Sequence, residues 1–264
     1  MAPRGGRGLV VRGADRPIPR ATFRYWNDQP IIESARTLAG ELSAYAQKHP
    51  DHGVSLLTHS MGGLVARAVI EDPELDPGNV RQLIMVCPPN GGSRLAHFGF
   101  ALDLAEHMAD PRRRREVGLL AAIAEDGLSE AAADLVPESP LLHELNSRPR
   151  NPHVRYSIFL GTKAVFTRAQ MQRWRERAGQ LDSRNRWLRF FGPRFRRWLD
   201  DLDELVHGQG DGVVAVRRGR LDGVEDMTVL HVSHLDVLQN PPEGDVLKLR
   251  RMIYQRLLDA SRPQ

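Results

Sequence analysis

One stretch most constrains what this chain can fold into: residues 54–67, with the sequence VSLLTHSMGGLVAR. An apolar, strand-like run ends at Ser60, two glycines follow, and a helix-forming run begins at once. This pattern is typical of a nucleophile elbow, a sharp strand-to-helix turn that exposes a serine hydroxyl above a sheet. The glycines leave room for a helix that turns tightly back onto its own strand. Thr58 stands where such motifs usually have glycine, and the alternative interpretation is an ordinary turn with a helix-capping serine.

The bulk properties fit one domain with a buried core. The chain has 264 residues, of which 41% are hydrophobic. No apolar run approaches the roughly 18 residues of a membrane span, and the basic amino terminus carries no apolar segment long enough for a signal peptide. Cys87 is the single cysteine, so no intrachain disulfide can form. We therefore expect a single domain over residues 1–264 and a cytoplasmic location.

Charge and ligand patterns indicate neither nucleic-acid nor metal binding. The formal net charge is only +4, and the basic residues are spread along the chain without a recognised nucleic-acid module. The ten histidines do not recur at metal-ligand spacing, and a lone cysteine adds no metal-binding pattern. No glycine-rich phosphate loop is present. The sequence therefore predicts no nucleic-acid partner, no metal and no cofactor.

Apolar periodicity predicts alternating strands and helices. Strands are expected at 21–26, 54–59, 80–86, 154–160 and 227–232, and helices at 31–47, 64–70, 95–108, 117–134 and 244–258. Such alternation predicts an α/β fold with a mainly parallel sheet and helices on both faces.

Three chemically useful residues follow strands of this predicted sheet. Ser60 ends the elbow strand, Asp211 begins an acidic Asp-Gly turn, and His234 lies two residues beyond the last expected strand. In open α/β sheets the working groups lie in loops at the carboxyl ends of strands. A serine hydroxyl needs a base to take its proton, and a carboxylate orients the histidine that does so. We expect Ser60, Asp211 and His234 to form a catalytic triad.

Other histidines could serve as the catalytic base in place of His234. His231 falls inside the last expected strand, where a packed histidine is the better interpretation, and His207 stands beside a glycine. His59 precedes the serine and is expected to pack beside it.

The acid also has alternatives in Asp201, Asp203 and Asp226. The first two fall in a helix-like pattern, and Asp226 opens the last strand at its amino end. Asp211 is better placed, although a plain Asp-Gly turn would look the same.

Four motifs carry a resemblance to a known family. They are THSMGGLVAR at 58–67, CPPNGGS at 87–93, DLVPESP at 134–140 with Leu145-Asn146, and DGVV at 211–214 with Ser233-His234. In this order they resemble α/β-hydrolase-fold lipases and esterases, especially the GPI-inositol-deacylase-like branch. The resemblance implies Ser60 as nucleophile, Asp211 as acid, His234 as base and the Met61 backbone N–H as an oxyanion donor. It also implies hydrolysis of small apolar carboxylic esters through an acyl-enzyme, with acyl transfer as an alternative.

The same family normally has an earlier strand ending in His-Gly, whose following loop gives a second oxyanion donor. Residues 1–20 contain no histidine and leave no room for the usual intervening helix. We expect the usual amino-terminal strands to be missing from this sequence; the alternatives are a substitute amide or a weakened, inactive protein that binds a lipid, membrane or protein partner.

A basic and aromatic segment separates the last two expected strands. Residues 162–208 are expected to form a helical cap or lid inserted in the domain. Residues 184–199 hold two tryptophans and three phenylalanines among arginines, a composition suited to covering an acyl pocket or contacting a lipid surface. The alternative is a helical pair that packs on the body of the domain.

Overall fold

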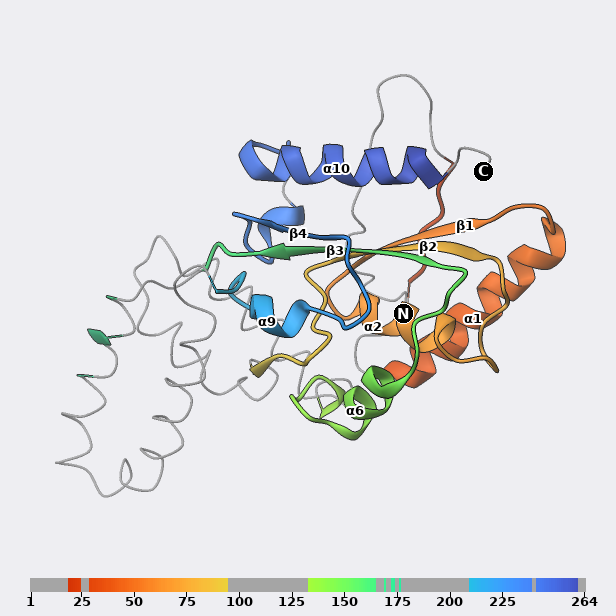
Figure 1. Ribbon diagram of the computed structural model, residues 1–264, viewed down its shortest axis with the longest axis horizontal. Helices are drawn as coiled ribbons and strands as arrows, with labels where there is room; N and C mark the ends of the chain where they lie inside the picture. Colours follow the sequence, from red (N-terminus) through yellow and green to blue (C-terminus); the bar gives the residue numbers. More distant parts are fainter. Residues whose placement is uncertain are drawn as a thin grey trace, which may run out of the picture.

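The computed structural model describes residues 19–24, 29–94, 133–164, 209–238 and 241–260, with single positions at 169, 172, 173 and 176. The described residues build a four-stranded parallel sheet with helices on both faces (Figure 1). Its strands are β1 (Val54–His59), β2 (Val80–Val86), β3 (Arg155–Gly161) and β4 (Met227–Leu230), in the order β1-β2-β3-β4. All three strand pairs are parallel. The predicted α/β class and parallel sheet are confirmed.

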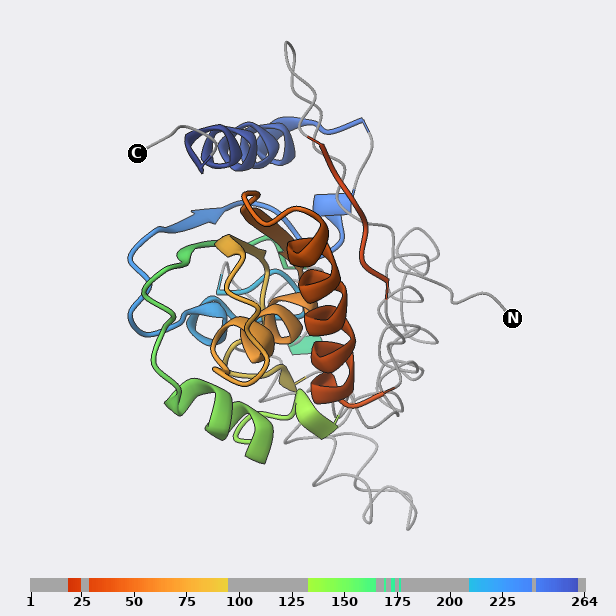
Figure 2. The ribbon, with the colours of Figure 1, turned by 90° about the vertical axis from the view of Figure 1, so that its right-hand side faces the viewer.

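The helices lie on opposite sides of this sheet. In Figure 1, α10 (Gly244–Ala260) covers one face, whereas α1 (Ile31–Lys48), α2 (Gly62–Ile70), α6 (Pro140–Ser147) and the short α9 (Val216–Gly219) lie across the other. Figure 2 shows the same layers at right angles, with α1 running along one side of the sheet. None of the described helices is long and apolar enough to cross a membrane.

Side-chain alternation along the strands explains the two cores. In β2, Leu83 and Met85 pack in the core shared with α1 and α2, whereas Ile84 and Val86 pack against α10. Successive strand residues point to opposite faces of a sheet, so a strand that is apolar at every position is covered on both sides. The apolar run that marked β2 in the sequence is therefore the consequence of burial on two faces.

The start of α1 is fixed from a distant part of the chain. Pro30 precedes the helix and offers no capping side chain. The Asp134 carboxylate instead accepts the Ile31 backbone N–H at 2.9 Å. A carboxylate there satisfies an otherwise unpaired donor and suits the positive end of the helix dipole. This contact ties the segment that precedes α6 to the first turn of α1.

Several predicted elements need correction or lie outside the described residues. Residues 21–24 belong to no strand, contrary to the strand expected at 21–26, and residues 25–26 are not described. β4 ends at Leu230, two residues earlier than predicted. The helix predicted at 95–108 lies outside the described residues, as does nearly all of the helix at 117–134 and of the insertion at 162–208, including 184–199.

Candidate active site

The strand-to-helix turn predicted around Ser60 is confirmed. β1 ends at His59, α2 begins at Gly62, and Ser60 between them has a φ of 54°. A positive φ is uncommon for a residue other than glycine and is a recurring sign of a strained functional turn. A Cβ on Gly63 would lie 3.1 Å from the Pro88 side chain, so the close approach of α2 to the chain after β2 explains this glycine.

Two donors at the elbow lie next to each other. The Ser60 hydroxyl makes no hydrogen bond to another described residue, and neither does the Met61 backbone N–H. Met61 has helical backbone angles and caps α2, so its N–H belongs to the first turn, where helix donors have no partner within the helix. An unpaired N–H beside a serine hydroxyl is the arrangement that stabilises a developing oxyanion.

Asp211 and His234 form a buried pair. The distance from Asp211 Oδ2 to His234 Nδ1 is 2.8 Å, and both side chains are at most 3% exposed. The other carboxylate oxygen, Oδ1, accepts the backbone N–H groups of Val213 and Val214 at 2.9 and 2.7 Å. Burial alone raises the pKa of Asp211, but His234 and these two amides more than offset it, so the pKa falls below its usual value. Asp211 is therefore a carboxylate aimed at the imidazole.

The backbone also holds these two residues together. His234 N–H donates to the Asp211 carbonyl at 2.9 Å. Gly161, the last residue of β3, lies directly beneath them: a Cβ there would stand 2.3 Å from the Val232 carbonyl and 2.7 Å from Asp211 Cβ. The acid and base loops approach this closely because β3 ends in a residue without a side chain.

His59 connects this pair to the elbow. His59 Nε2 lies 3.1 Å from the His234 carbonyl oxygen, and the two rings are 4.6 Å apart between centroids. Burial first, and then the neighbouring His234, lower the pKa of His59 to about 3. The structure therefore brings Asp211 and His234 together and sets the His234 ring against the residue that precedes Ser60.

The Cys87 side chain also lies close to the Asp211–His234 pair. Potential ligand atoms of Cys87, Asp211 and His234 all lie within 4.8 Å of one another. Burial, and next the Asp211 carboxylate, raise the pKa of the Cys87 thiol well above its usual value. Metals bind the thiolate, so a protonated thiol hydrogen-bonded to Asp211 fits a structural role better than a metal ligand.

Comparisons with known proteins agree with this architecture. Residues 36–124 match the family described as "PGAP1-like alpha/beta domain". The mature form of the Bacillus licheniformis lipase BlEst2 aligns over 88% of this chain and 75% of that chain, with a TM-score of 0.52 and 16% identity. Its propeptide form aligns over 84% of this chain and 41% of that chain, with a TM-score of 0.51 and 18% identity. No curated protein matches this sequence significantly.

The chain has an α/β-hydrolase fold. The predicted resemblance to lipases and esterases of that fold is confirmed. In this fold the elbow follows β1, and the Asp211 and His234 loops follow β3 and β4, so all three lie at the carboxyl edge of the parallel sheet.

The alternative candidates for the catalytic acid and base have other surroundings. His231 is exposed and lies beyond β4, not inside it as predicted; its backbone N–H donates to the Asp245 carboxylate at 2.9 Å. Asp226 accepts hydrogen bonds from Ser157 and Arg256, at the amino end of β4. His207, Asp201 and Asp203 lie outside the described residues.

Sequence reasoning missed a buried polar network behind the elbow. The Arg67 guanidinium, on α2, donates to the Glu71 carboxylate, to the side-chain oxygens of Asn90 and Asn146 at 3.0 Å each, and to the Leu145 carbonyl at 2.9 Å. The network joins α2 to the loop after β2 and to α6. The sequence held one signal for this network: the family-like motifs at 58–67, 87–93 and 145–146 contain Arg67, Asn90 and Asn146.

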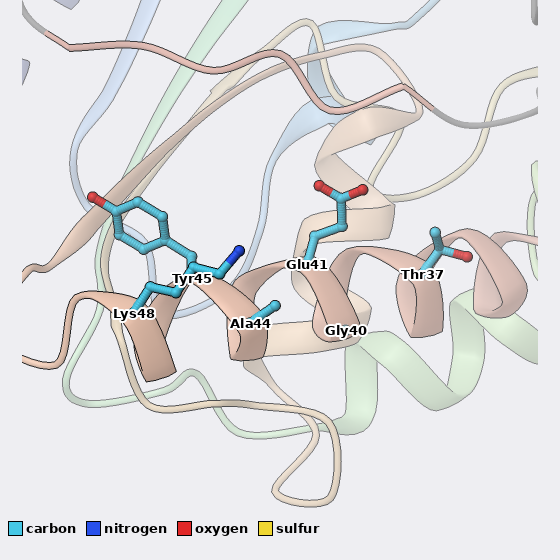
Figure 3. Close-up of a pocket in the computed structure, with 6 residues that line it drawn as sticks. All are labelled: Thr37, Gly40, Glu41, Ala44, Tyr45 and Lys48. Carbon is cyan, nitrogen blue, oxygen red and sulfur yellow. The ribbon is translucent and has the colours of Figure 1, made fainter.

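A groove elsewhere on the molecule is separate from this site. It is lined by residues of α1 alone: Thr37, Gly40, Glu41, Ala44, Tyr45 and Lys48 (Figure 3). None of the candidate site residues lines it, so we assign the chemistry to the elbow.

Proposed function

We propose that this α/β-hydrolase is a serine hydrolase that cleaves carboxylic esters through an acyl-enzyme on Ser60. The observation that carries the proposal is the buried Asp211–His234 pair, whose imidazole packs on the residue next to Ser60. Because Nδ1 of His234 is engaged by Asp211, its Nε2 is the nitrogen available to a serine hydroxyl. That division of roles is the one a Ser-His-Asp triad requires.

In the first half of the proposed reaction, Ser60 Oγ attacks the ester carbonyl carbon while His234 Nε2 takes the hydroxyl proton. The carbonyl oxygen gains the negative charge, and the Met61 N–H donates to it. When the tetrahedral intermediate collapses, the bond to the alkoxy oxygen breaks and His234 returns its proton to the leaving alcohol. Asp211 stabilises the imidazolium throughout without taking its proton.

In the second half, water replaces the alcohol. His234 removes a proton from the water, which attacks the acyl carbon, and the collapse of the second intermediate releases the carboxylic acid and restores the Ser60 hydroxyl. An alcohol in place of water would complete an acyl transfer by the same steps.

The proposed substrates are small esters with apolar, lipid-like acyl chains. The resemblance to lipases and esterases supports this class, and BlEst2 is itself named a lipase. The aromatic residues at 184–199 are the proposed cover of the acyl chain or contact with a lipid surface, on the strength of composition alone.

The test compares hydrolysis of p-nitrophenyl esters of increasing acyl length by the wild type and three variants. Ser60→Ala should lower turnover by on the order of a millionfold, because triad residues act as a unit. Asp211→Asn should lower it by roughly ten-thousandfold, because the amide presents a donor to Nδ1 and forces the wrong tautomer on His234. Asp226→Asn is the matched control, since this carboxylate belongs to the Arg256 contact and should be dispensable for turnover.

Two results would redirect the proposal. Unchanged hydrolysis in Ser60→Ala would remove Ser60 as nucleophile. A folded wild type without hydrolysis or acyl transfer to added alcohols would favour the inactive, ligand-binding alternative.

A further inference from the structure

His59 joins two parts of the site that the sheet keeps apart. β1 carries Ser60 and β4 precedes His234, and the strand order places these two strands at opposite ends of the four-stranded sheet. Three inter-strand steps separate them, about 14 Å at ordinary strand spacing. The loop after β4 must therefore fold back over β3 and β2 to bring His234 to the elbow.

The loop after β4 reaches the elbow at the contact between His59 and His234. His59 Nε2 lies 3.1 Å from the His234 carbonyl oxygen. A carbonyl oxygen only accepts, so Nε2 must be the donor and must carry the proton. His234 is then held at three points: its backbone N–H and its Nδ1 by Asp211, and its carbonyl by His59.

We propose that His59 is a positioning residue: a permanently neutral imidazole with its proton on Nε2, which anchors the catalytic-base loop to the nucleophile strand. This inference rests on the proposed function, since it treats His234 as the base of Ser60. His59 itself touches no reacting atom and acts through the position of His234.

The neutral state of His59 matters because its ring is in contact with the ring of His234. Within the described ranges, the titratable groups that act on the His59 ring are His234 and Asp211. During acyl transfer His234 becomes an imidazolium, and a second positive charge 4.6 Å away between ring centroids would oppose it. Burial and the His234 ring, which lower the pKa of His59 to about 3, keep that second charge from forming at working pH.

Two substitutions separate the hydrogen bond from the ring contact. His59→Gln keeps a side-chain N–H donor that reaches like Nε2, whereas His59→Phe keeps a flat ring and removes the donor. Loss of this partly buried hydrogen bond should lower kcat/KM of the Phe variant by roughly tenfold or more, mainly through kcat. The Gln variant should stay within about threefold of the wild type. Equal losses in both variants, or no loss in the Phe variant, would overturn the proposal.

A measurement on the wild type tests the same inference without activity. In a ¹⁵N-histidine NMR titration, the resonances absent from His59→Gln identify His59 among the ten histidines. We expect a neutral ring with its proton on Nε2 from pH 8 to pH 5. A proton on Nδ1, or protonation near pH 6.5, contradicts the inference even if the Phe variant fails to fold. If the wild type shows this tautomer yet hydrolyses no ester, the proposed function has failed and the structural role of His59 stands.

Discussion

Gly161 determines how closely the proposed acid and base can approach the end of the sheet. It ends β3, where an added Cβ would stand well inside van der Waals contact with the Val232 carbonyl and with Asp211 Cβ. Neither neighbour can give way freely, because one is backbone and the other is fixed by hydrogen bonds from Val213 and Val214. The glycine is therefore needed for its lack of a side chain.

Gly161→Ala should displace the acid and base loops together. A shift near 1 Å in catalytic geometry costs on the order of a hundredfold in rate, and overpacking of this kind costs about 1–3 kcal/mol of stability. We expect kcat/KM to fall by that factor and the melting temperature to drop, measured by ester hydrolysis and calorimetry.

The matched control for that change is Gly40→Ala. Gly40 lies in α1, is exposed, and has nothing within 4 Å of an added Cβ. Alanine is the better helix former, so this variant should gain up to about 1 kcal/mol and keep full activity. Equal behaviour of the two variants would mean that Gly161 is not a point of close approach.

At the scale of elements, Arg67 connects α2 to two segments that do not neighbour it in sequence. Its guanidinium is fully buried and its ion pair with Glu71 is inaccessible to solvent. Asn90 adds a donor of its own, since its side-chain amide bonds the Gly219 carbonyl at 2.9 Å and so extends the network to α9. The elbow is therefore supported from behind by a network that joins α2, α6, α9 and the loop after β2.

Arg67→Met should be strongly destabilising. Among the described residues it leaves Arg150 as the one charged partner of the buried Glu71 carboxylate, and removing one member of a buried pair costs about 3–5 kcal/mol. Urea unfolding monitored by circular dichroism measures this loss. Arg36→Met, at an exposed position of α1, is the control and should change stability by less than about 0.5 kcal/mol. A loss in Arg67→Met no larger than in the control would show that the network is not cooperative.

Local patterns of apolar residues in the sequence predicted the helices and strands that bury one or both faces along their whole length. The helix expected at 31–47 is α1, the strand at 80–86 is β2, and the closing helix at 244–258 is α10, because burial imposes period 3.6 or an unbroken apolar run. The strand expected at 21–26 was wrong at 21–24, since aromatic and β-branched composition cannot show whether a neighbouring strand is there to pair with. β4 stops early because the chain must turn after Leu230 to carry His234 back toward Asp211.

The sequence could predict only those site residues that are chemically reactive and that follow the end of an expected strand. Ser60, Asp211 and His234 have residue types and chain positions that a pattern can reveal. Gly161, Cys87 and His59 gain their roles from contacts with residues 50 or more positions away, and no local spacing encodes such contacts.

For the molecule as a whole, the environment of the partly buried His59 predicts how stability depends on pH. The pKa of His59 falls from 6.5 to about 3 on folding, so between these values the unfolded chain binds a proton that the folded chain does not. Stability therefore rises with pH across this window, by up to about 1.4 kcal/mol per pH unit from this residue. The slope of unfolding free energy between pH 4 and pH 6 should be smaller in His59→Gln by up to this amount. Identical slopes in the two proteins would show that the fold does not hold His59 as a neutral ring.

The central claim is that Ser60 is a nucleophile activated by His234, and covalent labelling tests it most directly. Wild-type protein treated with an alkyl fluorophosphonate should gain one phosphonyl group, located by peptide mass mapping to the tryptic fragment that contains Ser60. Ser60→Ala should take up no label, and Asp211→Asn should label far more slowly while remaining folded. Folded wild-type protein that stays unlabelled, or a label that persists in Ser60→Ala, would contradict the account.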